Sequence, residues 1–277
     1  MSRNLNSSEV APGKPTQYID TYTPSLLYSI ERAESRELMA LTGALPFGGE
    51  DVWNAFEFTW LDSGGKPQAA AVRINVPCSS PCMVESKSLK LYFNSFAMSR
   101  FSNKADILST LNSDLALAFR APVMVNLLEL DQIPEQVDRL PGTCLDGLNV
   151  EVESYERAPQ LLLLEDGEER AVKETLHTNL FRSLCPVTSQ PDFATLVIQY
   201  LGRPIFRTGL LRYLISYRSH QGFHEDTVEQ IFVDLLEKCR PEQLSVAGYF
   251  LRRGGIDINP YRSNVDEQAP ALRLPRQ

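Results

Sequence analysis

The sequence predicts an α+β protein built from two similar modules, and three observations support this fold class. Paired segments of alternating apolar and polar residues, typical of strand hairpins, occur once in each half of the 277-residue chain. Segments with apolar residues at helical spacing follow each hairpin. A further apolar segment of strand length follows these helices in both halves. Each half therefore has the order hairpin, helix, strand, which is a repeat of pattern and not of residues.

The predicted first module covers residues 25–168 and follows a polar N-terminal arm of residues 1–24. Its hairpin begins where Phe56, Phe58 and Trp60 alternate with polar side chains, and a Gly-Gly turn then reverses the chain. The predicted elements are strands at 54–61 and 70–76, a helix at 104–119 and a buried strand at 122–130.

The predicted second module covers residues 169–277. Residues 131–169 are the least regular part of the sequence, so we place the module boundary there. Val228, Ile231 and Phe232 form the apolar stripe of its longest helix. The predicted elements are strands at 172–182 and 195–200, helices at 209–217 and 225–238, and a strand at 244–251 that ends before Gly254 and Gly255.

Charge and composition narrow the classes of function. The formal net charge is −8 and no basic run occurs, so no nucleic-acid binding is predicted, because such binding depends on phosphate contacts. No apolar run approaches the roughly 18–20 residues that span a bilayer, so no membrane partner is predicted. The first ten residues lack the apolar core of a secretory signal, which makes the cytoplasm the expected compartment. Five cysteines, an odd number, favour free thiols.

Cys185 is the main candidate for a catalytic residue. It lies in a predicted turn flanked by Pro186 and Pro191, and Asp192 follows seven residues later at the start of a strand. The nearby Arg182 would favour the thiolate, which is the nucleophilic form. A thiolate and a carboxylate in one pocket suit covalent catalysis with proton transfer to an adjacent atom. The alternatives are a small buried side chain for Cys185 and a turn residue for Asp192.

Two other segments offer polar side chains that could serve the same site. His224 and Glu225 precede a helix, where Glu225 could simply favour the helix N-terminus through its charge. Glu85 and Lys87 could equally belong to a solvated strand edge. These alternatives remain open from the residues alone.

Motifs for metals and dinucleotides are not evident. Cys78 and Cys82 have CxxxC spacing without a second pair of ligands nearby, so no metal site is predicted. The sequence also has no glycine-rich dinucleotide loop of either common type. A dinucleotide would therefore have to be held by scattered cations. The candidates are Lys87, Lys90, Arg252, Arg253 and Arg262.

Four motifs, spread over nearly the whole chain, point to one known family. Residues 85–92 read ESKSLKLY, residues 223–225 read FHE, residues 252–260 read RRGGIDINP, and Cys185 is followed by Asp192. In these motifs the chain resembles the QueF family of NADPH-dependent 7-cyano-7-deazaguanine reductases, the nitrile reductases of queuosine biosynthesis. It is similar to the longer, two-module members. The ESKSLKLY segment is specific, whereas the Cys–Asp spacing alone is not.

The resemblance implies tandem tunnelling-fold modules with antiparallel sheets backed by helices, and a homodimer. It also implies reduction of 7-cyano-7-deazaguanine to 7-aminomethyl-7-deazaguanine with NADPH as the cofactor. The Cys185 thiolate would add to the nitrile carbon to give a thioimidate, and Asp192 would carry the proton between thiol and nitrile nitrogen. Two hydrides would then yield the primary amine. Covalent activation suits this substrate because a nitrile is a poor hydride acceptor.

The resemblance implies roles for the remaining site residues. Glu85 and Glu225 would accept hydrogen bonds from the base, and His224 would position the substrate or help to protonate the intermediate. Because Cys185 lies in the second module and Glu85 in the first, the pocket must form where modules meet. The other expected substrate contacts are Met83, Val84 and Phe223. The expected NADPH contacts are Ser86, Lys87, Lys90, Arg253 and Gly254.

Two other functions compete with this interpretation. A zinc-dependent relative of the same fold would hydrolyse a pterin-like or purine-like ring, but Cys185 and His224 leave its metal ligands incomplete. A non-catalytic purine-binding protein would bind the base without turnover. From composition and periodicity alone, the sequence predicts only a soluble two-module α+β protein with a candidate thiol site.

Overall fold

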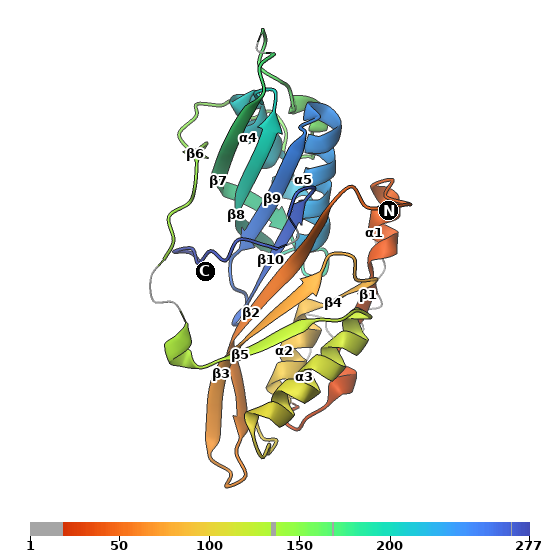
Figure 1. Ribbon diagram of the computed structural model, residues 1–277, viewed down its shortest axis with the longest axis vertical. Coiled ribbons are helices and arrows are strands. Elements are labelled where there is room, and N and C mark those ends of the chain that lie inside the picture. Colours follow the sequence, from red (N-terminus) through yellow and green to blue (C-terminus); the bar gives the residue numbers. More distant parts are fainter. Residues whose placement is uncertain (1–18, 134–136, 168, 267) are drawn as a thin grey trace.

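The computed structural model describes residues 19–133, 137–167, 169–266 and 268–277, so most of the predicted N-terminal arm lies outside the described residues (Figure 1). The strands are β1 (Ser29–Glu31), β2 (Gly48–Leu61), β3 (Pro67–Pro77), β4 (Cys82–Val84), β5 (Met124–Leu128), β6 (Thr143–Cys144), β7 (Val172–Leu184), β8 (Pro191–Gly202), β9 (Gln243–Phe250) and β10 (Ile256–Ser263). The helices are α1 (Arg32–Leu38), α2 (Ser86–Asn94), α3 (Lys104–Phe119), α4 (Arg207–Ile215) and α5 (His224–Cys239).

Eight strands form one sheet in the order β5-β3-β2-β10-β9-β8-β7-β6, and β1 pairs separately with β4. All neighbours in the large sheet are antiparallel except β6 and β7. The β2–β3 and β7–β8 hairpins each contain one register irregularity, between Ala55 and Phe58 and between Thr178 and Phe181. The two halves thus share a bulged hairpin, in agreement with the predicted α+β repeat.

The helices cover one face of the sheet. Figure 1 shows α2 and α3 against one half and α4 and α5 against the other. Strand β10 shows that both helix pairs lie on the same face of the sheet. Ile258 packs in the core beneath α2 and α3, and Arg262 contacts Glu229 of α5. The two residues are four positions apart in the strand, so their side chains point to the same face. The opposite face carries a smaller apolar cluster that includes Tyr249, Tyr261 and Leu274.

Two large hydrophobic cores stabilise the halves. One lies between α2, α3 and the strands β2 and β3, and the other between α4, α5 and the strands β7 to β9. The helix stripe of Val228, Ile231 and Phe232 is completely buried, as its spacing predicted. Phe47, which precedes β2, packs edge-to-face on Phe232 and so belongs to the second core although it is early in the sequence.

Strand β10 connects the halves. It pairs with β2 along its whole length and with β9 over three residues. Its Ile256 and Ile258 belong to the first core. The sequence did not predict this strand, because Gly254 and Gly255 precede it and Pro260 interrupts its apolar pattern. The module boundary near residue 168 stays a prediction.

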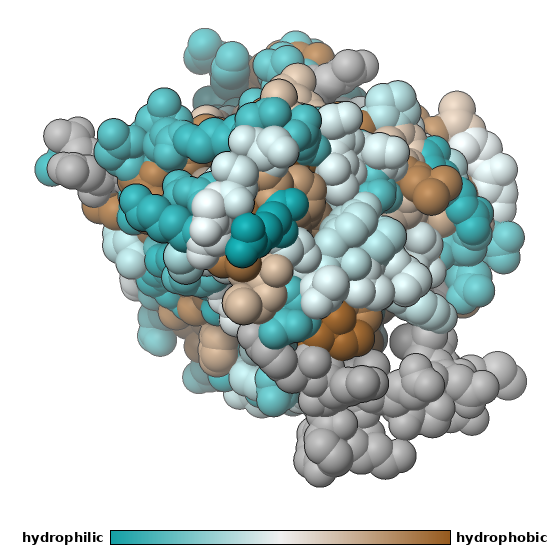
Figure 2. Space-filling view, turned by 90° about the horizontal axis from the view of Figure 1, so that it is seen from below, coloured by the Kyte–Doolittle hydropathy of each residue, from teal (hydrophilic) through white to brown (hydrophobic). Residues whose placement is uncertain are grey.

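One sequence prediction was wrong in detail. The strand expected to be buried at 122–130 is β5, which lies at the edge of the sheet and pairs with β3 alone among the described strands, and its Met124 is 62% exposed. The open alternative that Glu85 and Lys87 belong to a strand edge is excluded, because residues 86–94 form helix α2. Among the described helices, none is both long and apolar enough to cross a bilayer. The end of the molecule seen in Figure 2 mixes hydrophilic and hydrophobic residues.

Candidate active site

A cavity of about 310 Å³ lies where the two halves meet. Its walls come from the start of α2, the turn between β7 and β8, the start of α5 and the segment that leads into β10. The cavity brings together most of the predicted site residues, from both halves of the chain. The predicted residues that line it are Val84, Glu85, Ser86, Lys87, Lys90, Cys185, Asp192, Phe223, His224, Glu225 and Arg253.

Cys185 lies directly after β7, in the turn that the prolines predicted. Its backbone N–H donates to Gln190 O at 2.9 Å, and its carbonyl accepts from Ser189 N at 2.9 Å. Leu184, just before it, exchanges backbone hydrogen bonds with the 220–222 segment. The thiol is partly exposed and free. These contacts fix the backbone on both sides of the sulfur while leaving it open to the cavity.

Asp192 faces Arg253 and His224. It is 4% exposed, and its Oδ1 accepts from Arg253 Nη1 at 2.5 Å while Oδ2 lies 3.3 Å from His224 Nε2. Burial opposes ionisation, but the hydrogen bonds and charges of His224 and Arg253 hold the pKa of Asp192 below its usual value. Asp192 is therefore a carboxylate, able to accept a proton.

His224 is the first residue of α5 and is fixed by stacking. Its ring lies 3.8 Å from that of Phe250, at an interplanar angle of 7°. Its Nε2 points at Asp192, whereas Nδ1 is buried with no hydrogen-bond partner among the described residues. An imidazole with one nitrogen at a carboxylate can relay a proton to a bound ligand.

Glu85 caps the N-terminus of α2. Its two carboxylate oxygens accept from the backbone N–H groups of Lys87 at 2.9 Å and Ser88 at 2.7 Å. The ESKS sequence thus begins a helix by the usual capping geometry, with a glutamate in place of the commoner short side chains. This places the carboxylate at the cavity wall and at the positive end of the helix dipole.

Glu225 is the second residue of α5 and only 3% exposed. Among the described residues no other side chain hydrogen-bonds its carboxyl group. Burial, with a smaller contribution from the charge of Asp51, raises the pKa of Glu225 to about 8, and the charge of Arg32 opposes this shift. The expectation that Glu225 stands at a helix N-terminus is met, but helix capping does not explain a buried carboxyl that lines a cavity.

The cations are distributed differently from the sequence expectation. Arg182 donates to the carbonyl of Arg218, and Arg253 instead lines the cavity together with Cys185, where burial is outweighed chiefly by the hydrogen bond and charge of Asp192, so that the pKa of Arg253 is raised. Burial and the charge of Arg253 lower the pKa of Lys90. Arg252 stacks on Phe56, 4.6 Å from the ring centre.

Two predicted residues are outside the cavity lining. Met83 is buried in β4, next to Val84, which does line it. Gly254 has a positive φ of 61°, and a side chain there would meet Lys90 at 3.2 Å. Its role in the structure is therefore to let the turn before β10 pass close to Lys90.

Several lining residues were missed by sequence reasoning. Thr188 and Gln190 lie inside the Cys185–Asp192 turn, and their hydrogen bonds to Arg253 could have been suspected from that position. Trp53 of β2 and the isoleucines of β10 reach the cavity only through the fold, and no sequence signal marks them. Among the described residues, no group of three or more histidine, cysteine, aspartate or glutamate side chains could hold a metal ion.

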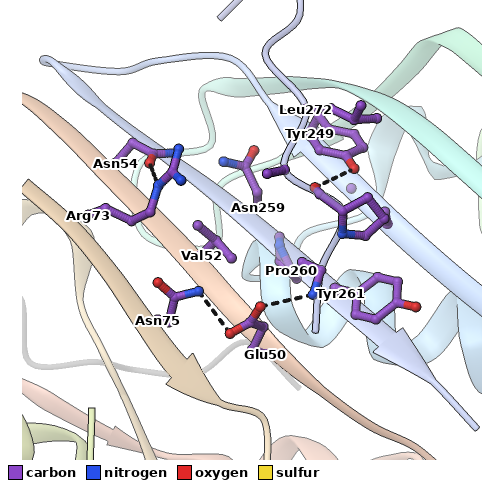
Figure 3. Close-up of a pocket in the computed structure, with 15 residues that line it drawn as sticks. Glu50, Val52, Asn54, Arg73, Asn75, Tyr249, Asn259, Pro260, Tyr261 and Leu272 are labelled. Atoms are coloured by element: carbon purple, nitrogen blue, oxygen red, sulfur yellow. Dashed lines mark hydrogen bonds between the residues drawn. The ribbon is translucent and has the colours of Figure 1, made fainter. Parts of the chain in front are cut away.

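A second, smaller cavity of about 60 Å³ lies on the helix-free face (Figure 3). Glu50 accepts from Asn75 Nδ2 and from the backbone of Ala269, and Tyr249 donates to Pro270 O. The C-terminal segment thus closes over the sheet here. None of the predicted site residues lines this cavity.

The fold and the first cavity define an α+β protein with a cysteine-centred pocket between two related halves. Residues 18–127 match a family model described as "Nitrile reductase, 7-cyano-7-deazaguanine-reductase N-term", and residues 191–269 match one described as "QueF-like protein". The chain is 45% identical over 278 residues to the NADPH-dependent 7-cyano-7-deazaguanine reductase of Desulfotalea psychrophila, with 100% of both chains covered. It is 47% identical over 276 residues to that of Bordetella avium, covering 98% and 99%. The chain belongs to the family of NADPH-dependent 7-cyano-7-deazaguanine reductases, which confirms the resemblance found in its motifs.

Proposed function

We propose that this protein reduces the nitrile of 7-cyano-7-deazaguanine to the primary amine of 7-aminomethyl-7-deazaguanine, a precursor step of queuosine formation in tRNA. The overall reaction consumes two NADPH and two protons and adds four electrons to the carbon–nitrogen triple bond. The observation that carries the proposal is the convergence of Cys185, Asp192, Glu85 and Glu225 on one cavity, in a chain that belongs to this family.

The covalent step begins at Cys185. Its sulfur adds to the nitrile carbon, one carbon–nitrogen π bond breaks, and the nitrogen gains a proton, which gives a thioimidate. Asp192 is ionised in the free protein, so it can take the proton from the thiol and pass it to the nitrogen. His224, 3.3 Å from Asp192, can share in this transfer.

NADPH would supply two hydrides: the first would reduce the thioimidate carbon, the Cys185 thiolate would then leave to give an imine, and the second hydride with a proton would reduce the imine to the amine. The residues that suit its phosphates are the cations at the cavity, Lys87, Lys90 and Arg253. Ser86 and Gly254, in the helix start and in the turn beside them, complete the proposed contact set.

Base recognition falls to the two glutamates. A guanine-like ring presents a ring N–H group and an exocyclic amine, and carboxylate oxygens accept from both. A buried site of this kind rejects analogues without these donors, because its polar groups would go unpaired. Phe223 and Val84 supply apolar wall against the ring.

We also propose that the protein acts in the cytoplasm as a homodimer, without nucleic-acid or membrane partners. The helix-free face of the sheet supports a second copy, because among the described residues its apolar cluster is covered by Leu140 and the C-terminal segment and by no helix. Light scattering on the purified protein should give about twice the 31.2 kDa of one chain. A mass of one chain at micromolar concentration would contradict the dimer.

The central test uses the base without NADPH. Mixing intact protein with 7-cyano-7-deazaguanine should produce a new absorbance band and a covalent mass increase equal to the mass of the base. Both should be lost in Cys185→Ala. A non-catalytic binding protein would bind the base with no adduct, and amine formation by Cys185→Ala would refute the mechanism.

A further inference from the structure

A buried ionic network lies behind the Glu225 wall of the cavity. Arg32, the first residue of α1, is 1% exposed and donates from Nη2 to Asp51 Oδ2 at 2.5 Å and from Nε to Ser80 Oγ at 3.2 Å. Arg262 of β10 donates to Asp51 at 2.8 Å and to Glu229 at 2.8 Å. The network thus connects α1, β2, α5 and β10 at the junction of the halves.

One donor in this network has no acceptor. Arg32 Nη1 is buried and has no hydrogen-bond partner among the described residues, and Glu229 Oε1 lies 3.8 Å away, beyond hydrogen-bond reach. A buried N–H group left unpaired destabilises the protein, so it marks a place where an acceptor is expected.

Glu225 is a buried carboxyl group that no other described side chain hydrogen-bonds. It lies one helical turn before Glu229 on the same face of α5, and its charge acts on Arg32. Burial, with the charge of Asp51, raises the pKa of Glu225 to about 8 and so favours its protonated form at neutral pH. The titratable groups around it are Arg32 on α1, Asp51 on β2, His224, Asp226 and Glu229 on α5, Arg262 on β10, and Glu85 and Lys90 across the cavity.

The base requires the opposite protonation state. Its ring N–H and amine are both donors, and a carboxylate can accept both, whereas a neutral carboxyl group would place one of its own donors against them. We propose that Arg32 is a positioning residue whose free Nη1–H group receives the Glu225 carboxylate when the base binds, so that binding releases the Glu225 proton to solvent. This inference rests on the proposed function, because it takes Glu225 as the acceptor for the base.

Proton release is measured by titration calorimetry of 7-cyano-7-deazaguanine into the Cys185→Ala protein, which cannot form the adduct. At pH 7, titrations in buffers of different ionisation enthalpy should show close to one proton released per base. The number should fall towards zero at pH 9.5, where Glu225 is already ionised. Glu225→Gln in the same background should release none.

The role of Arg32 is tested against its neighbour Arg36, which donates to Glu229 at 2.8 Å. In the Cys185→Ala background, Arg32→Met should weaken base binding about 10- to 100-fold at pH 7. It should also move the pH range in which base affinity increases, as Glu225 ionises, to higher pH. Arg32→Lys, which keeps the charge, should restore part of the affinity. Arg36→Met should lower the unfolding midpoint comparably but leave base affinity and proton release unchanged.

The outcomes separate this inference from the proposed function. Base binding without proton release at pH 7, or an Arg32→Met protein that binds and releases protons like its parent, would overturn the inference alone. If Arg32→Met is unfolded, the Lys variant and the proton count of the parent still decide. No base binding at any pH, with no adduct in the intact protein, would overturn the proposed function itself.

Discussion

Asp192 shows how single contacts set the chemistry of the cavity. Its two oxygens face Arg253 and His224, which favour its ionised form, whereas at Glu225 burial and the charge of Asp51 outweigh the charge of Arg32 and favour the neutral form. The surroundings of these two carboxyl groups thus shift their pKa values in opposite directions, down for Asp192 and up for Glu225. Such a separation is typical of sites that divide acid and base roles.

We predict that Asp192→Asn slows thioimidate formation by about 100-fold or more, because the amide cannot take the thiol proton. Base binding should remain, since the glutamates supply it. Stopped-flow absorbance after mixing with 7-cyano-7-deazaguanine measures the rate. Asp146→Asn is the matched control: it removes a hydrogen-bonded carboxylate of lowered pKa outside the cavity and should not change the rate. Equal rates for Asp192→Asn and its parent would exclude this proton transfer.

Among the secondary-structure elements, the start of helix α2 contributes both to stability and to the proposed binding of the base. Glu85 caps the helix, so the same carboxylate that faces the cavity also satisfies two backbone donors. Glu85→Ala should cost about 1 kcal/mol of unfolding free energy and lower the midpoint by about 2–4 °C. It should also weaken base binding, which calorimetry in the Cys185→Ala background would show.

Helix α3 offers the matched comparison. Asn103 caps it by accepting from Asp106 N at 2.9 Å, far from the cavity. Asn103→Ala should lower the midpoint by a similar amount and leave base affinity intact. If both variants bind the base as tightly as the parent, Glu85 is a structural cap and not a binding residue.

The sequence predicted the elements that are determined by neighbouring residues and missed those that depend on distant parts of the chain. Helix α3 was predicted at its observed bounds from its apolar spacing, which is a local pattern. Helix α2 was not predicted, since its cap is a glutamate and its nine residues form a short pattern. Strand β10 was missed because its place is determined by partners far along the chain, which alternation within eight residues does not reveal.

The candidate site was also predictable only in part. Most of the predicted site residues line one cavity, although Met83 and Gly254 do not, and the roles of all of them stay predictions. The wall contributed by Trp53, Ile256 and Ile258 could not be predicted, because it exists only once β10 lies beside β2. The roles of Arg32 and Asp51 could not be predicted for the same reason. In the sequence alone, the two residues of a buried ion pair cannot be distinguished from two charged surface residues.

For the whole molecule, the central position of β10 predicts that the halves are not independent. A fragment of residues 1–150 would lack β10, exposing the edge of β2 and part of the first core. Expressed alone, it should aggregate or fail to unfold cooperatively, whereas co-expression with residues 151–277 should recover a soluble complex. Circular dichroism and size-exclusion chromatography measure this. A cooperatively folded 1–150 fragment would contradict the prediction.

The position of β10 after every other described strand also affects the order of events during translation. The strand that completes the sheet leaves the ribosome after β7 and β8, so a growing chain carries the thiol of Cys185 before any finished cleft surrounds it. Ligand capture must therefore wait until residues 256–263 have been released. Premature termination even a short distance before residue 256 would yield a polypeptide with every motif except the closing one and no place to receive the base.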